Sequence, residues 1–388
     1  MAERALRIGV AGLGRAFALM RPALHAHPRI EVVAAADPRE EAQRRFTEEF
    51  DGAVAYGDYA ALCADPAVDA VYVATPHALH APCAIAAARA GRHVLVEKPM
   101  ALSLDECDAM IAAAREAGVA LVVGHSHGAD PPVQAARALI DSGAYGRVRM
   151  ITALNFTDYL YRPRRPEELD TARGGGAVYN QAAHQVDVAR RLAGAPVRSV
   201  RAVAGAWDAA RPTEGAYTAL LTFDGGAAAS LTYSGYAHFD SDELAGWIGE
   251  MGHPRDRSRY GAARAALSTA TTAEAELAQK RARNYGAQAD APAPPPVAHH
   301  HFGFVVVSCE GADLRPTPQG VIVYDDRRER LHPLPPPAIP RAEVFDALCD
   351  AAAGARAPHY DGEWGRATLA VCLAILRSSR EGREIAPA

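Results

Sequence analysis

Lysine is nearly absent from this chain of 388 residues. Of its 41 lysine and arginine residues, only two are lysine, Lys98 and Lys280. Arginine stays charged, whereas a lysine ammonium group can lose its proton near neutral pH when it is desolvated or lies beside another positive charge. Lys98 directly follows an apolar strand-like run in RHVLVEKPMAL. This position suggests a chemical role that a guanidinium group cannot fill.

Long apolar runs, paired cysteines and an excess of basic charge are also lacking. No segment approaches the roughly 20 uninterrupted apolar residues of a membrane span, and the glycine-rich N-terminal stretch does not read as a secretion signal. The six cysteines show no CxxC or CxxH spacing, which favours reduced thiols and the cytoplasm. A formal net charge of −5 gives no reason to expect nucleic acid as a partner.

The length of the chain and the order of its apolar runs predict two domains. From Leu6 to about Gly124, short runs rich in β-branched residues and alanine alternate with helical stretches, the pattern of a parallel sheet covered on both faces. Residues 1–125 are therefore predicted to form an α/β domain of the Rossmann type with a doubly wound parallel sheet.

Residues 126–388 are predicted to form an α+β domain with a large, mostly antiparallel open sheet. Strand-like runs dominate this part of the chain, and Asp224-Gly225-Gly226 is a hairpin signal between two of them. Residues from about 252 to 300 read as an insertion, with a helix over 259–283 and a proline run over 292–296, that forms a lid or a surface decoration.

A dinucleotide signal lies at the end of the first predicted strand. In GVAGLGRAF, Gly12 and Gly14 stand where the strand turns into a helix, so that the backbone can approach a pyrophosphate at the N-terminus of the helix. Asp37 ends the second strand, where a carboxylate would accept the ribose hydroxyl groups and repel a 2′-phosphate. We therefore expect NAD, although the neighbouring Arg39 leaves NADP as the alternative.

The helix that follows these glycines departs from the usual fingerprint. Phe17 occupies the third glycine position, so close packing of helix and strand must come from Ala16 or Ala18. Arg15, Ala16 and Phe17 are expected beside the cofactor at the start of the helix. Pro22 is expected to interrupt this helix.

The sequence resembles the Gfo/Idh/MocA oxidoreductases. The resemblance is carried, in order, by GVAGLGRAF, AAADP, VATPHALH, VLVEKPMAL and GGGAVYNQAAHQVD, and it covers nearly the whole chain except residues 252–300. It implies an NAD(P)-dependent dehydrogenase acting on CH-OH or CH-CH groups, with an N-terminal Rossmann domain. It also implies a C-terminal substrate domain whose open sheet often forms the interface of a homo-oligomer, here a dimer or tetramer.

The resemblance assigns the lysine of the EKP element to catalysis. Lys98 would lie beside the nicotinamide and the substrate hydroxyl group, with Glu97 next to it. The loop after the third βα unit would line the cofactor with Thr75, Pro76, His77 and His80. The positive nicotinamide of the oxidised cofactor would disfavour the protonated form of Lys98, which answers why a lysine stands there.

The second catalytic element is YNQAAHQVD. Asn180 and His184 are four residues apart, so on a helix they would share one face, and Asp187 could orient the ring of His184. Many relatives have aspartate at the position of Asn180. Because asparagine cannot take a proton, either His184 or Lys98 must accept the hydroxyl proton, with Asn180 positioning the substrate by a hydrogen bond.

The predicted substrate is a carboxylated ring. Arg162, Arg164 and Arg165 could bind carboxylates, or instead form a surface loop held by Glu167 and Glu168. The candidate ring contacts are Tyr159, Tyr161 and Tyr179.

Within the family, the sequence resembles the phthalate 4,5-cis-dihydrodiol dehydrogenase branch. This implies NAD-dependent oxidation of a cyclohexadiene cis-diol to a catechol. The alternatives are an NAD(P)-dependent sugar, inositol or other polyol dehydrogenase, and a non-catalytic dinucleotide-sensing regulator. His299, His300 and His301 lack a clear carboxylate partner in the sequence, so no metal site is expected.

Overall fold

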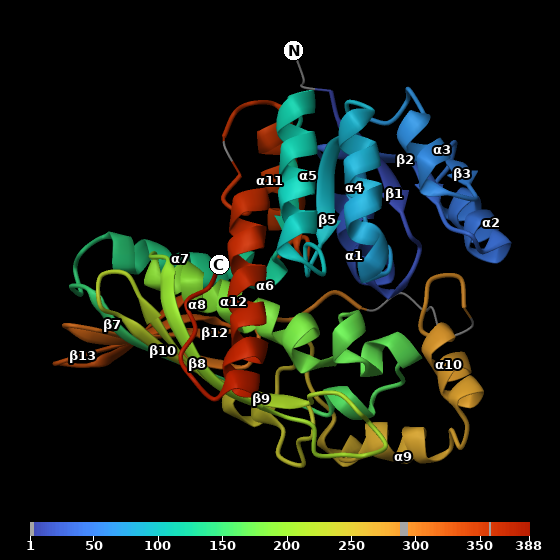
Figure 1. Ribbon diagram of the computed structural model, residues 1–388. Helices are drawn as coiled ribbons and strands as arrows, with labels where there is room; N and C mark the ends of the chain where they lie inside the picture. Colours follow the sequence, from blue (N-terminus) through green and yellow to red (C-terminus); the bar gives the residue numbers. More distant parts are fainter. Residues whose placement is uncertain (1–3, 288–293, 357) are drawn as a thin grey trace. The chain divides into compact units, whose positions relative to one another are not determined.

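The computed structural model describes residues 4–287, 294–356 and 358–388, and the chain divides into two compact units. Unit 1 comprises Met1–His125, Ala278–Ala293 and Ile339–Leu369, and unit 2 comprises Ser126–Leu277, Pro294–Ala338 and Ala370–Ala388 (Figure 1). Tyr285 and Phe345, from two of the later segments of unit 1, lie in the apolar core of that unit.

Unit 1 is built on a six-stranded parallel sheet. Its strands are β1 (Leu6–Ala11), β2 (Ile30–Ala36), β3 (Val54–Tyr56), β4 (Ala70–Val73), β5 (His93–Glu97) and β6 (Leu121–Gly124). The order is β3-β2-β1-β4-β5-β6, and every neighbouring pair is parallel. The order reverses between β1 and β4, and ligands of such sheets bind outside the carboxyl ends of the strands at this point. The predicted Rossmann architecture is confirmed.

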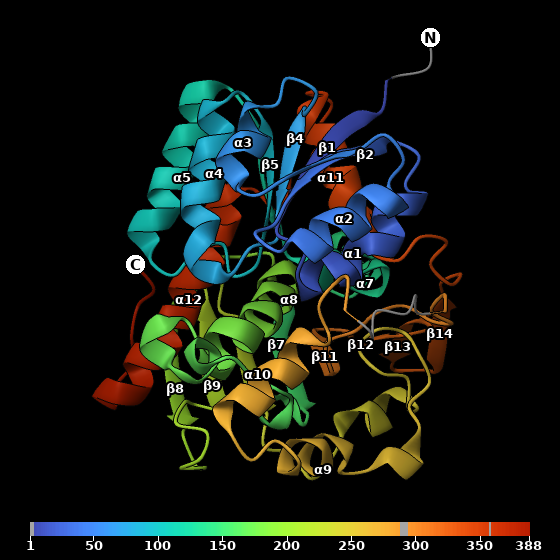
Figure 2. The ribbon, with the colours of Figure 1, turned by 90° about the vertical axis from the view of Figure 1, so that its right-hand side faces the viewer.

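Helices cover both faces of this sheet. One face carries α1 (Arg15–Ala26), α2 (Glu40–Glu49) and α11 (Ala342–Ala352), whose apolar side chains share a core with β1 and β4. The opposite side carries α3 (Tyr59–Ala64), α4 (His80–Arg89) and α5 (Leu104–Ala117) (Figure 2). Ser103 caps the N-terminus of α5 in a capping box with Glu106, and Gly118 in the left-handed conformation caps its C-terminus.

The expectation that Pro22 interrupts the first helix was wrong. Pro22 lies inside α1, which continues to Ala26. A proline removes one backbone N–H donor, and the buried side chains of Phe17, Met20 and Leu24 hold the rest of the helix on the sheet.

Unit 2 is built on an eight-stranded sheet. Its strands are β7 (Val148–Phe156), β8 (Val197–Gly205), β9 (Ala216–Phe223), β10 (Ala228–Ser234), β11 (Phe304–Cys309), β12 (Ala312–Thr317), β13 (Gly320–Asp325) and β14 (Glu329–Pro333). The order is β14-β13-β12-β11-β7-β10-β9-β8, and only the pair β7 and β10 is parallel. The predicted, mostly antiparallel sheet is confirmed. Gly225 and Gly226, both with positive φ, form the predicted hairpin between β9 and β10.

One face of the second sheet is covered and the other is open. The helices α7 (Pro131–Asp141) and α8 (Ala183–Ala193) and the second half of α12 (Gly362–Glu381) bury apolar side chains against it. On the other face, Val203 of β8 and Leu220 of β9 are 57% and 51% exposed. The short helix α6 (Ser126–Ala129) precedes α7.

The insertion contains two helices rather than the predicted one. They are α9 (Ala262–Ser268) and α10 (Ala273–Arg281). Threonines at 269, 271 and 272 separate them, and β-branched residues are poor helix formers. Residues 288–293 of the predicted insertion lie outside the described residues. No helix in the described ranges has both the length and the apolar character needed to cross a membrane.

Candidate functional site

The carboxyl edge of the sheet in unit 1 gathers the residues predicted to bind the cofactor. Gly12 follows β1, Asp37 follows β2, Thr75 follows β4 and Lys98 follows β5. Because all these strands are parallel, their carboxyl ends meet at one edge. The structure therefore brings together four positions that are far apart in the sequence.

The turn after β1 fits a pyrophosphate group. Gly12 has a φ of +96°, and a Cβ atom there would lie 2.8 Å from the carbonyl oxygen of Ala74, so only glycine suits this position. A Cβ atom at Gly14 would meet nothing within 4 Å, and no side chain caps the N-terminus of α1. The N-terminus of α1 directly after this turn is the kind of place at which a helix binds an anion.

Thr75 supplies a further polar group beside this turn. Its hydroxyl oxygen is buried and has no hydrogen-bond partner among the described residues. Its backbone nitrogen would lie 2.9 Å from a Cβ atom at Gly12. A buried hydroxyl group without a protein partner is costly, and a bound dinucleotide would supply one. These residues therefore fit NAD.

The other residues predicted at the cofactor range from fully buried to exposed. The ring of Phe17 is fully buried, 4.8 Å from the ring of Tyr285. Glu97 accepts a hydrogen bond of 2.7 Å from the hydroxyl group of Tyr72. Arg15 is exposed at the start of α1, and Ala16 is half-buried. Pro76 is exposed, and His77 lies beside His80 with ring centroids 5.4 Å apart.

His80 joins the two loops on which Thr75 and Lys98 stand. Its Nδ1 lies 2.9 Å from the carbonyl oxygen of Pro99, and its Nε2 lies 3.0 Å from that of Thr75. Burial lowers the pKa of His80, and the nearby charge of Lys98 acts in the same direction. His80 therefore braces the loop after β4 against the turn of Lys98. Lys98 itself is half-buried, and its peptide bond to Pro99 is cis.

In unit 2, a buried carboxylate positions the start of the segment that carries Asn180 and His184. Glu214 accepts the N–H of Val178 at 3.0 Å and the hydroxyl proton of Thr171. A Cβ atom at Gly176, which has a φ of +81°, would collide with this carboxylate. Burial raises the pKa of Glu214. The glycine run before Ala177 thus makes room for Glu214, which the sequence did not single out.

Asn180 and His184 were predicted to share one regular α-helix, and this prediction was wrong. Asn180 belongs to a π-helical turn, η5 (Val178–Ala182), and His184 to the α-helix that continues from it. The side-chain nitrogen of Asn180 donates to the carbonyl oxygen of Gly176 at 2.8 Å. Such π-turns are frequent at functional sites. Asp187, predicted to orient His184, is fully buried with its carboxyl group against Gly128.

Aromatic rings surround His184. Its ring centroid lies 4.6 Å from that of His127, with the ring planes at 78°, and 4.7 Å from that of Phe302. The ring of Tyr233 is parallel to Phe302 at 6.2 Å. Phe302, Tyr233 and His127 therefore form one wall around His184, and none of them was predicted from the sequence.

His127 lies between two carboxylates. Its Nδ1 is 2.8 Å from Oδ2 of Asp130 and its Nε2 is 3.2 Å from Oε1 of Glu250. A carboxylate oxygen only accepts, so this arrangement favours donation by both ring nitrogens, which is the imidazolium form of His127. Burial opposes this charge, but the two carboxylates prevail and raise the pKa of His127. The signal in the sequence was His127 three residues before Asp130 in HSHGAD, directly after β6.

The three predicted substrate arginines all have carboxylate partners within unit 2. Arg162 pairs with Asp158 at 2.8 Å. Arg164 donates to the carbonyl oxygen of Tyr159 at 2.6 Å, lies 3.6 Å above that tyrosine ring and faces Glu168 at 3.6 Å. Arg165 pairs with Glu167 at 3.2 Å and with Glu168 at 3.3 Å. Glu167 and Glu168 therefore pair with Arg164 and Arg165, although Arg164 is buried rather than part of a solvated surface loop.

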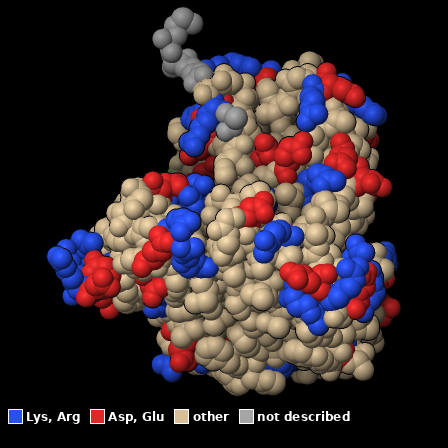
Figure 3. All heavy atoms as spheres, turned by 60° about the vertical axis from the view of Figure 1, so that its left-hand side comes forward, with Lys and Arg blue, Asp and Glu red and all other residues tan. Residues whose placement is uncertain are grey.

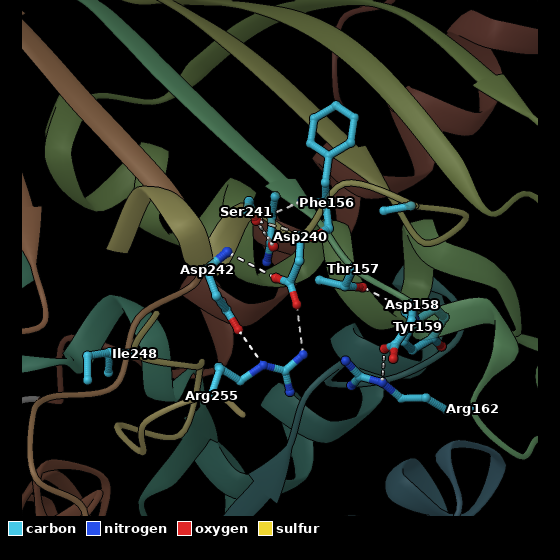
Figure 4. Close-up of polar contacts among 12 residues, drawn as sticks. Phe156, Thr157, Asp158, Tyr159, Arg162, Asp240, Ser241, Asp242, Ile248 and Arg255 are labelled. Atoms are coloured by element: carbon cyan, nitrogen blue, oxygen red, sulfur yellow. Dashed lines mark hydrogen bonds and ion pairs between the residues drawn. The ribbon is translucent and has the colours of Figure 1, made fainter. Parts of the chain in front are cut away.

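Arg162 belongs to a second ionic cluster, which the sequence did not indicate. Figure 4 shows the guanidinium groups of Arg162 and Arg255 pointing toward one another. Arg255 pairs with Asp240 at 2.8 Å and with Asp242 at 3.1 Å. Burial and the neighbouring Asp240 raise the pKa of Asp242 to about 7. The charge of Arg162 also acts on Tyr233 and Glu250, both of which border the His127–His184 pair.

The remaining predicted contacts of unit 2 are scattered. Tyr159 is buried beneath Arg164, Tyr179 is 9% exposed on the π-helical turn, and the hydroxyl group of Tyr161 donates to Asp208.

His301 is a neutral tautomer, because its Nδ1 accepts from Gly303 and its Nε2 donates to the carbonyl oxygen of Ile248. The described residues contain no cluster of three or more His, Cys, Asp or Glu arranged to hold a metal ion.

Two family models and a curated relative match this chain. Residues 6–125 match an oxidoreductase family with an NAD-binding Rossmann fold, and residues 133–253 match the C-terminal domain of Gfo/Idh/MocA proteins. The chain is 48% identical to a 1-carboxy-3-chloro-3,4-dihydroxycyclohexa-1,5-diene dehydrogenase of Comamonas testosteroni, over 97% of this chain and 95% of that protein.

Two crystal structures extend the comparison. One is a protein of Bordetella bronchiseptica RB50 that is described as a dehydrogenase, with a TM-score of 0.93 and 43% identity over 98% of this chain and all of the other. The other is the WlbA dehydrogenase of Bordetella pertussis with NADH and UDP-GlcNAcA, with a TM-score of 0.68 and 26% identity over 99% of both chains.

An NAD-binding Rossmann unit followed by an open, mostly antiparallel sheet defines a dinucleotide-dependent oxidoreductase. The chain belongs to the Gfo/Idh/MocA family and is an NAD-binding dehydrogenase.

Proposed function

We propose that this dehydrogenase oxidises a carboxylated cyclohexadiene cis-diol to the corresponding catechol. The observation that carries the proposal is the near full-length similarity to an enzyme named for a dihydroxycyclohexadiene with one carboxyl group. The proposed substrate therefore needs one carboxylate rather than the two of a phthalate derivative. Loss of the carbinol hydride and the hydroxyl proton gives a ketone that tautomerises to an aromatic ring, which pulls the reaction forward.

The reaction separates a hydride from a proton. NAD, when bound, accepts the hydride at its nicotinamide ring. The residues of the chain position the diol and take the hydroxyl proton, and we assign this proton to Lys98 or His184. Lys98 follows β5 at the carboxyl edge of the Rossmann sheet, and the resemblance of the EKP element to the family supports a catalytic role for it. His184 is surrounded by Phe302 and His127 in unit 2.

A positive charge on His127 would influence the charge state of the neighbouring His184. A second positive charge on a ring with its centroid 4.6 Å away is electrostatically unfavourable. His127 thus favours a neutral His184, which is the form that accepts a proton. Asn180 has no titratable proton, so in this role its side-chain oxygen can only accept a hydrogen bond from a substrate hydroxyl group.

Arg162 is the arginine that we assign to the substrate carboxylate. It is the member of the predicted trio whose charge acts on Tyr233, which stacks on Phe302 beside His184. Arg164 and Arg165 serve the loop through Glu167 and Glu168.

A second candidate substrate is an uncharged polyol. Arg162, Arg164 and Arg165 each pair with a carboxylate of the chain itself, and an uncharged substrate does not need to compete for these arginines. In the cluster of Arg162 and Arg255, the carboxylates of Asp158, Asp240 and Asp242 also outnumber the guanidinium groups.

A matched panel of substrates separates these proposals. Purified protein with NAD is supplied with a carboxylated cyclohexadiene cis-diol, its methyl ester or myo-inositol, and reduced cofactor is followed by absorbance. The proposal expects kcat/KM for the acid to exceed that for the ester by about tenfold or more, because the ester keeps the ring and the diol but not the charge. Faster turnover of inositol would overturn it in favour of a polyol dehydrogenase. Tight NAD binding without turnover of any compound would favour a sensor.

The wider setting is also a proposal. We infer a cytoplasmic homo-oligomer, a dimer or tetramer, and no nucleic-acid or membrane partner. Support for the compartment comes from the six free cysteines. Support for the oligomer comes from the exposed Met150, Val203 and Leu220 on the open face of the second sheet. The face of the molecule in Figure 3 shows basic and acidic side chains intermingled, with a wide uncharged area in its lower half.

A further inference from the structure

Arg39 is hydrogen-bonded to the carboxylate of Asp37, the residue predicted to bind the ribose of the cofactor. Its Nε donates to Oδ1 of Asp37 at 2.9 Å, and one terminal nitrogen donates to Oδ2 of Asp37 at 3.1 Å and to the carbonyl oxygen of Leu13 at 2.7 Å. The other terminal nitrogen donates to the carbonyl oxygen of Tyr285 at 3.3 Å. Of the five N–H donors of a guanidinium group, four are thus engaged.

The carboxylate of Asp37 is equally engaged. Its Oδ1 receives the backbone N–H of Arg39 at 3.0 Å as well as the Nε, and its Oδ2 receives the backbone N–H of Leu13 at 2.8 Å. A carboxylate offers about four acceptor positions. The four N–H donors named here and above occupy these positions, so a ribose hydroxyl group has to share an oxygen with one of them. A 2′-phosphate group is repelled by Asp37 and finds the guanidinium group of Arg39 already committed.

The contact with Tyr285 comes from a segment almost 250 residues further along the chain. The side chain of Tyr285 is fully buried in unit 1, with its ring edge-on to Phe17 at 4.8 Å and beneath Arg21 at 5.5 Å. Its hydroxyl group donates to Glu49 of α2 at 2.8 Å. The neighbouring Gly286 lies against Ala42 of the same helix. This anchoring fixes the carbonyl group of Tyr285 beside Arg39.

We propose that Tyr285 is a positioning residue for cofactor choice: its segment holds Arg39 on Asp37 and thereby makes the enzyme select NAD over NADP. The segment does so by fixing a guanidinium group that would otherwise turn to a 2′-phosphate. The role is independent of the substrate, so it stands apart from the proposed oxidation of a cyclic diol.

The test is a double-mutant cycle with Kd values for NAD and NADP measured by calorimetry. Tyr285→Ala releases Arg39 and tightens NADP binding by about tenfold, the gain of one arginine–phosphate contact, while NAD binding stays within about threefold. Arg39→Gln leaves NADP binding of the otherwise unchanged protein within about threefold. In the Tyr285→Ala protein, the same Arg39→Gln change removes the gain.

Two control variants separate this effect from a loss of folding. Tyr260, an exposed tyrosine of the same insertion, provides Tyr260→Ala, which should leave both Kd values unchanged. Tyr285→Phe keeps the ring and loses only the bond to Glu49, so its effect should be smaller than that of Tyr285→Ala.

Two results would overturn the proposal. One is an unchanged ratio of the two Kd values in Tyr285→Ala protein that still binds NAD. The other is a loss of about tenfold or more in NADP binding on Arg39→Gln alone, which would show that Arg39 already reads the phosphate. The second result comes from Arg39→Gln, which leaves the buried core unchanged. It therefore tests the proposal even if Tyr285→Ala protein does not fold.

Discussion

Replacing Asp130 by asparagine tests whether His127 is a buried imidazolium ion. Asp130 stands at the N-cap position of α7, where an aspartate normally accepts a backbone N–H, yet no such bond is made. Its carboxylate is bonded to Nδ1 of His127 instead. An asparagine side chain would keep the shape and one acceptor oxygen, so the Asp130→Asn substitution removes mainly the charge.

The expected cost follows from burial. The side chains of His127 and Asp130 are 1% and 4% exposed, so solvent screens their interaction little. Loss of a charge-assisted hydrogen bond in such a place costs about 2–3 kcal/mol in free energy of unfolding. Glu250, at 3.2 Å and 34% exposed, is a weaker partner, and Glu250→Gln should cost about 1 kcal/mol. For a unit of roughly 200 residues, the Asp130→Asn change corresponds to a fall in Tm of about 4–12 °C.

The sign of the pH dependence is determined by the raised pKa of His127. Its charged pair with Asp130 stabilises the folded state fully below the unfolded pKa of about 6.5. This stabilisation is lost as the pH rises through the higher pKa of the folded state. The Tm difference between the unchanged protein and Asp130→Asn should therefore be largest near pH 6 and should shrink toward pH 9.

Thermal unfolding followed by calorimetry at both pH values measures this difference. The control is Asp141→Asn, an aspartate of the same helix that is 56% exposed in its pair with Arg137 and should cost about 0.5 kcal/mol or less. A neutral His127 is indicated if the deficit of Asp130→Asn is the same at pH 6 and pH 9. The same conclusion follows if Asp130→Asn costs no more than the exposed control.

Two further predictions concern the reaction. Lys98→Met should lower kcat by about a thousandfold with the Kd for NAD within about threefold, measured by stopped-flow absorbance and calorimetry. A loss of NAD affinity of the same size as the loss in kcat would instead make Lys98 a binding residue. Arg162→Ala should raise KM for the carboxylated diol by about tenfold and leave KM for its methyl ester unchanged. Arg164→Ala should lower Tm with little change in KM, and the reverse pattern would exchange the roles of the two arginines.

Much of the fold is readable from local patterns. The five alternating runs before His125 became strands β1, β2, β4, β5 and β6, because a strand buried on both faces needs a continuous apolar run. Gly12 marked the first turn because its φ of +96° suits glycine. The family resemblance, carried by short motifs in order, led to the NAD-binding dehydrogenase that the comparisons establish.

Local patterns failed where a local element was altered by its surroundings. The spacing of Asn180 and His184 predicted one regular helix, yet the first residue lies on a π-helical turn. Glu214 holds the start of that turn from a position 36 residues after Val178. The spacing of residues within the motif gives no sign of the contact with Glu214.

The sequence by itself determined the order of strands and helices, the glycine turn for a dinucleotide and the lysine at the end of β5. These features depend on backbone conformation and on the spacing of apolar residues, which neighbouring residues control. Only the tertiary structure decided which charges meet. Glu250 reaches His127 across 123 residues of chain, and Tyr285 reaches Arg39 across 246. A buried charge must find its counter-charge wherever the folded chain brings one within hydrogen-bond distance, and sequence separation carries no information about that encounter.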